Sequence, residues 1–301
     1  MKKKYSKLTP VSIIVPNWNG GEKIIRCLES ITKLDYPKFE VIVIDNNSLD
    51  GSNREIKKKF GKFKNFKIIE NKENVGNTEG LNQGFRLSNY SLILTLDNDV
   101  ILDKNMLKEL VKIILNDKKI GIVAPKLYFY KKSNFFNSTG YSVNLITGKT
   151  SIRGFNKKDV GQFDKQEEVD YVQDGVLLVK KEVLDKVKLM DNAFFVYYED
   201  TDFCLRVRKA GYKIVYVPSA KAWHDGNTRQ KGFTPFRAYH FIKSKILFMR
   251  KHSTNKFLFF SFFFFFYTPY RLLIITIKNP SSILPYFKGI KDGITHPLNY
   301  N

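Results

Sequence analysis

Short β-branched runs alternate with segments of helical periodicity over the first third of the chain, from Val11 to about Asp99. Near-continuous apolar runs are typical of strands that are covered on both faces, and apolar residues spaced three or four apart indicate helices. This alternation predicts βαβ units around a parallel sheet. The predicted strands are Val11–Val15, Glu40–Ile44, Lys67–Ile69 and Leu92–Leu96, and the predicted helices are Glu22–Leu34 and Asp50–Phe60.

The pattern is less regular between Gly121 and about Gly175, where we expect strands or loops without placing them. Regularity returns in the following segment, 175–187, which predicts a strand and then a helix. Thr201 begins a further predicted helix that Gly211 ends, and a strand over 212–218 follows it. These elements continue the same α/β architecture.

A long apolar segment, Phe257–Ile277, has about the length that crosses a bilayer as a helix. Pro269 and Arg271 interrupt it, and lysines crowd both of its ends, which are poor features for a spanning helix. Aromatic-rich segments bordered by lysine also suit the headgroup layer of an anionic membrane. We therefore expect a hydrophobic, membrane-associated helical tail that lies in the interface, crosses the bilayer or is buried under a partner.

Composition is typical of a globular protein from a reducing compartment. The 301 residues are 43% hydrophobic and 27% charged, and two cysteines cannot form a disulfide framework or a four-thiolate zinc site. At the N-terminus, Pro10 and Pro16 confine the first apolar run to Val11–Val15, which is too short for a signal-peptide core. We expect a protein that stays in the cytosol.

The charge balance is strongly basic, because 51 lysines and arginines stand against 29 acids and give a net charge of +22. Such a surface attracts nucleic acid, anionic lipid or a phosphorylated substrate. A nucleic-acid-binding protein is expected to interleave aromatic and basic residues on one face. Phe262–Phe266 is instead a consecutive block, which favours lipid and predicts no nucleic-acid partner.

Two aspartates follow the fourth predicted strand. Because side chains two apart on an extended strand point the same way, Asp97 and Asp99 can project together while Asn98 faces away. Paired carboxylates suit Mg²⁺ or Mn²⁺, which would also bind the phosphates of a nucleotide diphosphate. Taken alone, the pattern also fits an acidic turn. Other polar residues at strand ends, expected to line the same crevice, are Asn17, Asp45 and Asn71.

Two further polar segments follow strands. Asp45 can accept hydrogen bonds from a ribose or a base edge, while Asp50 and Ser52 in the same turn read as helix caps. In the later segment, glycines recur every four residues and allow a close approach either to a phosphate or to a packed neighbouring element. These glycines are Gly76, Gly80 and Gly84.

Acidic residues cluster at the start of the helix predicted after Phe194. Glu199, Asp200 and Asp202 fall in or near its first turn, where the helix dipole favours ionised carboxylates. Asp200 would serve as a general base toward an alcohol, or would only cap the helix. Asp202 is expected to pair with Arg206, four residues later. His224, at a strand exit beside a glycine, can add an imidazole to a manganese site.

These blocks, in this order, resemble the family 2 glycosyltransferases, which have the GT-A fold. The motifs are PNWNG (16–20), DNNSLDGS (45–52), NVGNTEGLNQG (74–84), LDNDV (96–100) and FVYYEDTD (195–202). The likeness runs from Val11 to about Asp225 and is close to the bacterial and archaeal rhamnosyltransferase-like branch. It implies a GT-A catalytic domain over 1–230, with a Rossmann-like, mostly parallel central sheet flanked by helices, and a basic, aromatic, helical region over 231–301.

The resemblance also implies roles for single residues. Asp97 and Asp99 would hold the metal, His224 would complete its site, and Asp200 would be the base. The residues expected to bind the nucleotide sugar are Pro16, Asn17, Asn19, Asp45, Asn47, Asn74, Gly76, Gly80, Asn82, Asp97 and Asn98. The acceptor-site candidates are Asp174, Gly175 and Glu199.

Departures from the family pattern concern specificity. Family members often have small residues and an aromatic where this chain has Asn77, Thr78 and Glu79, which leaves the donor preference open. Asp174 replaces a small or hydroxyl residue and would touch the acceptor or form only a turn. The QxxRW motif of processive synthases such as cellulose synthase is absent, since the only tryptophans are Trp18 and Trp223, so polymerisation by one chain is not expected.

The expected activity is a metal-dependent, hexosyltransferase-type reaction that inverts the anomeric carbon. It would move a sugar from a nucleotide-diphosphate donor to a hydroxyl of a glycan or lipid-linked acceptor, with Mg²⁺ or Mn²⁺, at the cytoplasmic face of the cell membrane. Cell-surface polysaccharide synthesis is the expected setting. The alternative is a nucleotidyltransferase of similar fold, but residues 17–22 lack the Gly-rich, Arg-containing loop that it needs. The sequence leaves the base, the sugar and the oligomeric state open.

Overall fold

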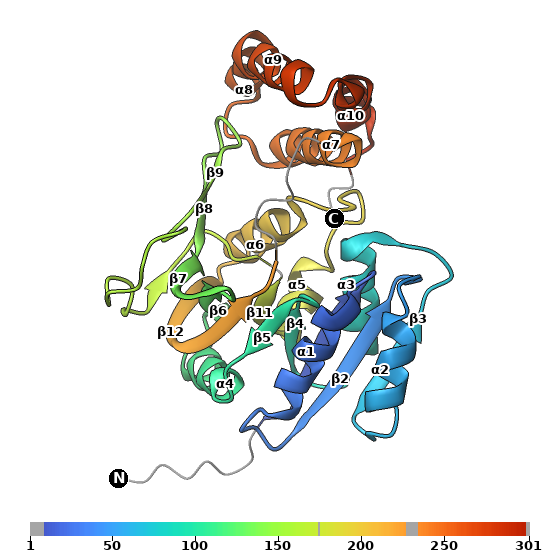
Figure 1. Cartoon of the computed structure of the whole chain (residues 1–301). Helices are drawn as coiled ribbons and strands as arrows, with labels where there is room; N and C mark the ends of the chain where they lie inside the picture. The colour runs from blue at the N-terminus through green and yellow to red at the C-terminus, as the bar shows by residue number, and fades with distance from the viewer. Residues whose placement is uncertain (1–8, 174, 227–233, 299–301) are drawn as a thin grey trace.

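The computed structural model describes residues 9–173, 175–226 and 234–298, and its first third consists of the predicted βαβ units (Figure 1). Near-continuous apolar runs form the strands, and the amphipathic segments between them form helices that pack on the sheet. The strands are β1 (Val11–Asn17), β2 (Phe39–Asp45), β3 (Phe66–Glu70) and β4 (Leu92–Leu96). The helices are α1 (Gly21–Thr32), α2 (Ser52–Phe60) and α3 (Gly76–Leu87).

The central sheet is mixed, with strand order β10-β12-β6-β11-β4-β1-β2-β3. Its β4-β1-β2-β3 part is parallel, as predicted, whereas β11 runs antiparallel to both β4 and β6. The other strands of the sheet lie in the segment that the sequence analysis could not place, or directly before or after that segment. They are β5 (Val100–Leu102), β6 (Ile120–Phe129), β7 (Lys132–Ser138), β10 (Glu167–Glu168), β11 (Val176–Lys180) and β12 (Lys213–His224).

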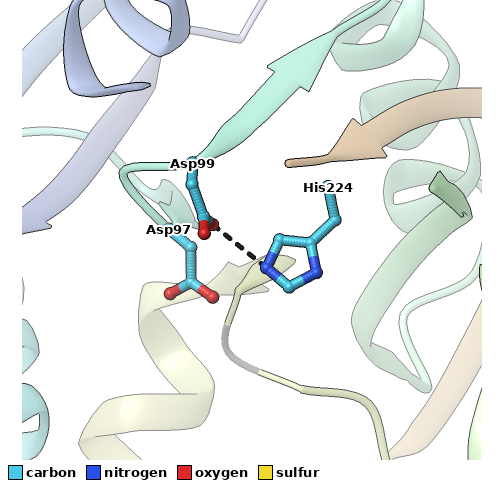
Figure 2. Close-up of side chains that lie close together, drawn as sticks. All are labelled: Asp97, Asp99 and His224. Atoms are coloured by element: carbon cyan, nitrogen blue, oxygen red, sulfur yellow. Dashed lines mark ion pairs between the residues drawn. The ribbon is translucent and has the colours of Figure 1, made fainter. Parts of the chain in front are cut away.

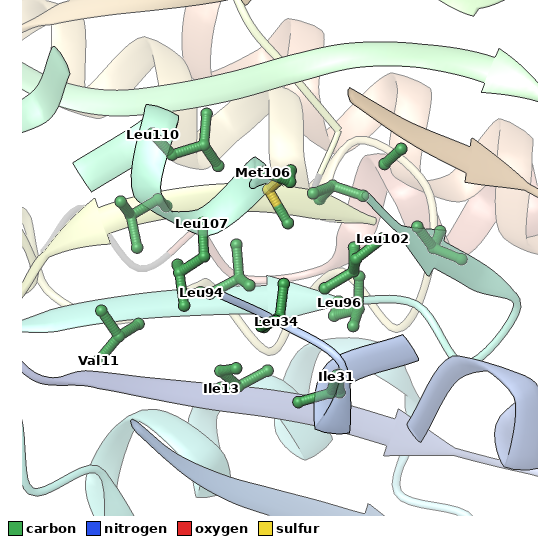
Figure 3. Packing of buried hydrophobic residues seen from close by; sticks show 14 of the residues in the cluster. Val11, Ile13, Ile31, Leu34, Leu94, Leu96, Leu102, Met106, Leu107 and Leu110 are labelled. Carbon is green, nitrogen blue, oxygen red and sulfur yellow. The ribbon is translucent and has the colours of Figure 1, made fainter. Parts of the chain in front are cut away.

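Each face of the sheet carries its own hydrophobic core, because successive side chains of a strand point to opposite faces. Ile13 and Val15 of β1 point to the face that α1 and α4 (Met106–Asn116) cover, and Figure 3 shows Ile13 near Leu94 of β4. Ile14 points to the other face, where it packs with Leu81 of α3 in the second core. Helices α5 (Lys181–Val187) and α6 (Glu199–Lys209) cover that second face.

A two-stranded hairpin extends from the sheet towards the C-terminal helices (Figure 1). It consists of β8 (Tyr141–Val143) and β9 (Thr150–Ile152), which pair antiparallel. At its tip, the carbonyl oxygen of Gly148 accepts hydrogen bonds from Tyr198 Oη, at 2.9 Å, and from Lys245 Nζ, at 2.8 Å. The hairpin therefore connects the start of α6 with the C-terminal helices.

The C-terminal helices form a third core with the edge of the α/β unit. Phe194 and Leu205 from the α6 region are buried together with Ile246 and Phe248 of α7. Within the described residues 234–298, the C-terminal region is helical and packs directly on the α/β unit, and the domain boundary at residue 230 stays a prediction. The elements of this region are α7 (Pro235–His252), α8 (Lys256–Phe262), the π-helix η1 (Phe263–Tyr267), α9 (Thr268–Lys278), the short η2 (Pro280–Ser282) and α10 (Ile283–Thr295).

Candidate active site

Asp97, Asp99 and His224 converge at the carboxyl end of β4 (Figure 2). One ligand atom from each of the three side chains lies within 4.8 Å of those of the other two, and His224 Nε2 is 3.0 Å from Asp99 Oδ1. His224 reaches this place because β12 is longer than predicted and pairs with β5, which directly follows Asp99. Two carboxylates and an imidazole form a donor set that Mn²⁺ accepts, so these side chains fit a divalent cation.

Neighbouring side chains hold His224 and Asp99 in place. The Asn137 amide lies 3.3 Å from the other ring nitrogen of His224, and Lys23 Nζ is 3.6 Å from Asp99 Oδ2. Burial acts to raise the pKa of Asp99, but the hydrogen bond and charge of His224, together with Lys23, outweigh it and lower that pKa. Burial acts to lower the pKa of His224, but the hydrogen bond to Asp99 and the charge of Asp99 outweigh it and raise that pKa. Asp99 is therefore kept ionised, as a cation ligand must be.

Two glycines leave room for these side chains. A Cβ atom at Gly175 would lie 2.5 Å from Asp97 Oδ2, and a Cβ atom at Gly226 would lie 2.5 Å from His224 Nε2. Both distances are shorter than side-chain atoms tolerate, so larger residues would displace the carboxylate and the imidazole. Gly175, an acceptor-site candidate, thus borders the metal-site candidate Asp97, and its carbonyl accepts the Asp97 amide at 2.9 Å.

Asn17 joins three strand ends. Its Nδ2 atom donates to Asp45 Oδ1 at 2.8 Å, and its Oδ1 atom accepts from Asn98 Nδ2 at 2.9 Å. Asn98 therefore turns away from the two aspartates that flank it, as predicted, but the cause is a turn and not an extended strand: β4 ends at Leu96, and the Val100 amide donates to the Asp97 carbonyl at 3.2 Å. Asp45 is fully buried, and its second oxygen accepts the Ser48 amide at 3.0 Å. The carboxyl ends of β1, β2 and β4 thus share one hydrogen-bonded network at the predicted crevice.

The turns after β1 and β2 each contain a strained asparagine. Asn19 and Asn47 have φ angles of 50° and 59°, a left-handed conformation that asparagine adopts more readily than most residues. The Asn19 side chain accepts the Leu49 amide at 2.8 Å and so joins the two turns, while Asn47 is exposed. The neighbouring Asn46 is buried and donates to the Gly76 carbonyl at 3.1 Å, a contact that sequence reasoning did not anticipate.

The glycine block on α3 mainly serves close packing. A Cβ atom at Gly84 would lie 2.2 Å from Ile14, and one at Gly76 would lie 2.7 Å from the Phe195 ring, so both positions require glycine. Gly80 faces Asn46 and the half-buried Pro16 at ordinary contact distance. The packing alternative considered for this spacing therefore applies to Gly76 and Gly84.

The polar residues of the same block tie α3 to the segment before α6. Asn82 donates to the Met190 carbonyl at 2.9 Å and accepts its amide at 3.0 Å, and Thr78 donates to the Phe194 carbonyl. Asn74 accepts the amide of Gly76 at 2.9 Å, which forms a local turn at the start of the helix. Both Asn82 and Asn74 thus have a positioning role in this structure.

Asp200 lies in the first turn of α6, where it is 8% exposed. Its Oδ1 atom accepts the Thr201 amide at 2.5 Å and the Thr201 hydroxyl at 2.9 Å, so it is not the capping residue. Burial raises the pKa of Asp200 to about 6, and the charge of Asp97 adds to this effect, against the hydrogen bonds from Thr201. The influence of Asp97 connects Asp200 electrostatically to the metal-site candidates.

The backbone before Asp200 is strained, because Tyr197 and Tyr198 have φ angles of 68° and 66°. Left-handed bulky residues are uncommon, and such strain clusters at functional sites. Glu199 is buried next to them and accepts Asn77 Nδ2 at 3.3 Å. The acceptor-site candidate Glu199 therefore contacts the α3 block, and Asp174 lies outside the described residues.

Asp202 has a structural environment different from that of Asp200. It is fully buried, and it pairs with Arg206 at 2.8 Å, as predicted from their spacing. From α7, Lys251 Nζ and His252 Nε2 each lie 2.7 Å from its Oδ1 atom. Burial acts to raise the pKa of Asp202, but the hydrogen bond from His252 and the charges of Arg206 and Lys251 lower it. Asp202 thus binds the C-terminal helices to α6.

Two tyrosines that the sequence analysis did not single out lie near Asp200. The rings of Tyr141 and Tyr171 are 5.0 Å apart, and the charge of Asp200 adds to burial in raising the pKa of Tyr171. A small cavity of about 30 Å³ lies beside them, lined by Asp97, His224 and Gln173 among others. Because Tyr141, Tyr171 and Gln173 come from the irregular segment between Gly121 and Gly175, only the tertiary structure brings them to the site.

The chain matches the family model described as "Glycosyl transferase family 2" over residues 12–187, which is more than half of its length. Among curated proteins, a poly-beta-1,6-N-acetyl-D-glucosamine synthase of Staphylococcus epidermidis is 24% identical over 228 residues. The match covers 74% of this chain and 52% of the synthase, so the chain spans about half the length of the curated relatives it matches.

Solved structures show the same fold. GalNAc-T7 with UDP, GalNAc and Mn²⁺ superposes with a TM-score of 0.68 at 14% identity, over 81% of this chain and 48% of that one. The mannosyltransferase PcManGT from Pyrobaculum calidifontis, in complex with GDP-Man and Mn²⁺, gives a TM-score of 0.59 at 17% identity, over 97% and 88% of the two chains. The fold is thus GT-A-like, and the match to the family model shows that the chain belongs to glycosyl transferase family 2.

Proposed function

We propose that this protein is an inverting, hexosyltransferase-type enzyme that moves a sugar from a nucleotide-diphosphate sugar to a hydroxyl of a glycan or lipid-linked acceptor. The observation that carries the proposal is the convergence of Asp97, Asp99 and His224, with the buried Asp200 within electrostatic reach of Asp97. Family membership favours this reaction over nucleotidyl transfer. The rhamnosyltransferase-like branch remains part of the proposal.

The donor would bind across the ends of β1, β2 and β4. Asp97, Asp99 and His224 would hold Mg²⁺ or Mn²⁺, which supplies positive charge for the departing diphosphate. Structural neighbours contain UDP or GDP-Man together with Mn²⁺, which supports this type of donor and leaves the base open. The other residues proposed to contact the donor are Pro16, Asn17, Asn19, Asp45, Asn47, Gly80 and Asn98. Asn74, Gly76 and Asn82, which the sequence also suggested, would instead position α3 beside it.

Asp200 would remove the proton of the acceptor hydroxyl. As the acceptor oxygen forms its bond to the anomeric carbon, the bond from that carbon to the phosphate oxygen breaks on the opposite face, and the nucleoside diphosphate leaves. The proton ends on the Asp200 carboxylate. A pKa of about 6 suits this role, because the group is mostly ionised at neutral pH yet more basic than an ordinary aspartate. Gly175 and Glu199, with Asp174, would border the acceptor.

The proposed setting is cell-surface polysaccharide synthesis at the cytoplasmic face of the membrane. The similarity to a relative named as a poly-beta-1,6-N-acetyl-D-glucosamine synthase supports polysaccharide synthesis. Within the described residues, one helix, Lys256–Lys278, is long and apolar enough to reach across a bilayer, which supports membrane association.

A panel of nucleotide sugars with Mg²⁺ or Mn²⁺ tests the proposed reaction. We expect one or a few donors to release nucleoside diphosphate only when a divalent cation is present, faster when a membrane fraction supplies the acceptor. Asp35→Asn, which changes an exposed surface acid, is the matched control for Asp97→Asn and should retain turnover. Turnover that persists with a chelator, or in Asp97→Asn, would contradict the proposed metal site.

A further inference from the structure

The long apolar helix Lys256–Lys278 begins and ends on the same side of its own protein. It starts directly after α7, and the chain that follows it returns as α10, which packs along α7 (Figure 1). A Cβ atom at Gly289 would lie 2.5 Å from the Tyr239 carbonyl oxygen, so α10 approaches α7 very closely. A helix that crosses a bilayer has its two ends on opposite sides of it.

Polar contacts fix this return. Tyr239 Oη donates to Asp292 at 2.7 Å, and Arg250 Nη1 donates to the Gly293 and His296 carbonyls at 2.9 and 2.8 Å. Helix α7 is itself attached to the catalytic unit through the buried Asp202 cluster and through Ser244, which donates to the Val196 carbonyl at 2.9 Å. Crossing the membrane would require α10 to separate from α7 and to break these contacts.

The π-helical turn keeps one face of the helix on the protein. Phe259 is buried before the turn, Phe263 at its first residue, and Thr268 and Ile275 after it. Phe263 and Thr268 are five residues apart, so in a regular α-helix they would differ by about 140° around the axis. The π-helical turn over Phe263–Tyr267, whose hydrogen bonds join residues five apart, brings them closer to one face. The helix is therefore shaped to pack sideways on α7 and α10.

The opposite face presents large apolar side chains to the outside. Only 22% of the most apolar part of the helix is buried inside the protein, although soluble proteins rarely expose a continuous apolar surface of this kind. In Figure 1, α8 and α9 form the outermost layer of the C-terminal helices. The most exposed residues of this helix are Phe257 (80%), Phe265 (77%), Ile277 (74%), Phe266 (68%), Tyr270 (62%) and Leu273 (62%), and Leu284 of α10 is 81% exposed.

Positive charges border this apolar face. Lys256 and Lys278 lie at the two ends of the helix, and Lys288 and Lys291 lie on α10, all of them exposed. The sequence contains no aspartate or glutamate between Phe257 and Lys291. Aromatic side chains with a rim of lysines match the acyl–headgroup boundary of an anionic leaflet, where the rings enter the apolar layer and the ammonium groups meet lipid phosphates.

We propose that the α8–η1–α9 helix lies in the plane of one anionic leaflet and attaches the enzyme from one side, without crossing the bilayer. The partner is the lipid surface itself. The proposal refines the membrane setting of the proposed function and does not depend on the sugar-transfer chemistry.

Vesicle flotation tests the attachment without any donor or acceptor. The full chain should float with vesicles that contain phosphatidylglycerol, and less with pure phosphatidylcholine or at high salt. The double variant Phe265→Ser, Phe266→Ser should reduce the bound-to-free ratio by at least about tenfold, because two exposed rings no longer enter the lipid. Val160→Ser, which changes an apolar side chain that is 76% exposed on the catalytic unit, should float like the parent.

Retained flotation of the double variant would overturn the proposal. A second outcome would also overturn it: the full chain does not float but forms a dimer, and the double variant is monomeric. The apolar face would then bind a second copy of the chain. Donor hydrolysis by the unbound enzyme is measured separately, so loss of binding and loss of chemistry are distinguished.

Cysteine labelling tests whether both ends of the helix lie on one side. The native Cys27 and Cys204 are buried, so Thr254→Cys and Ser281→Cys, both at exposed positions, can each serve as a reporter. A membrane-impermeant maleimide should label both positions in inverted membrane vesicles and neither in right-side-out ones. Opposite labelling of the two positions would show a spanning helix and overturn the proposal.

Discussion

The catalytic sheet and the C-terminal helices use the same apolar residues in opposite ways. In the sheet, β1 has both faces covered, so Ile13 and Ile14 are fully buried in two separate cores. In α8 and η1, phenylalanines such as Phe257 point out of the protein, and Phe265 is 77% exposed although it lies in the most apolar stretch of the chain. The first region satisfies its hydrophobic side chains internally, whereas the second needs an apolar phase outside the protein. We infer that chemistry and placement are divided between them.

Loss of the metal ligands is expected to have the largest effect and to separate the two regions. Asp99→Asn should lower turnover by about a thousandfold or more, because the charge that faces the departing diphosphate is lost. Flotation with anionic vesicles should be unchanged, since the C-terminal face is intact. Isothermal titration with Mn²⁺ should show weakened binding in the same variant. If vesicle binding fell together with turnover, the division between the two regions would be wrong.

Asp200→Asn tests the base without touching the metal. Transfer should fall by about 10²- to 10⁴-fold, while Mn²⁺ binding and donor binding persist. The variant should fold at least as stably as the parent, because it removes a carboxylate whose burial disfavours its charge. Unaltered transfer to the natural acceptor would refute the assigned role of Asp200.

Asp202→Asn breaks the connection between the two regions. Arg206 would lose its ion pair in a buried cluster, and Lys251 would keep only Asp191, so we expect a loss of about 3–5 kcal/mol in the free energy of unfolding. Urea denaturation measures this change. Lys108→Gln removes a surface pair with Asp35 whose partners are about half or more exposed, and it should change stability by less than about 0.5 kcal/mol. Equal losses of stability in both variants would contradict the role of Asp202 in attaching the C-terminal helices to α6.

The pH profile gives the smallest expected effect. The pKa of Asp200 is raised to about 6, so its basic form is lost as the pH falls through that value, and kcat/KM should then fall by up to about tenfold per pH unit. A cation bound at Asp97 opposes the contribution of that charge, so the decline falls at or below pH 6 when metal is present. The residual activity of Asp200→Asn should lack this acidic limb. A parent enzyme whose kcat/KM stayed constant between pH 7 and pH 5 would contradict this role for Asp200.

Local patterns in the sequence predicted several parts of the site correctly. The spacing of Asp97 and Asp99 predicted that they project together and that Asn98 faces away, and the structure shows both, although a turn after β4 and not strand alternation produces them. The pairing of Asp202 with Arg206 was predictable from local spacing, since residues four apart meet on a helix. The parallel part of the sheet followed from hydrophobic periodicity.

Contacts between distant segments were decided only by the tertiary structure. Tyr141, Tyr171 and Asn137 reach the site from a segment with no clear period, because β6 and β11 insert into the sheet and carry that segment across its edge. The same holds for the raised pKa of Asp200, which burial produces although its place at a helix N-terminus favours ionisation.

By itself, the sequence determined the strands and most helices of the first third and which acids stand two or four residues apart, since these depend on short-range geometry; it did not place the strands between Gly121 and Gly175. It also showed that the C-terminal helix is apolar enough to enter a bilayer. Only the tertiary structure decided that this helix returns to α7 and which of its faces is left uncovered, because the direction of a helix depends on what its neighbours bury. That arrangement, more than composition, underlies our proposal that the protein attaches to the membrane from one side.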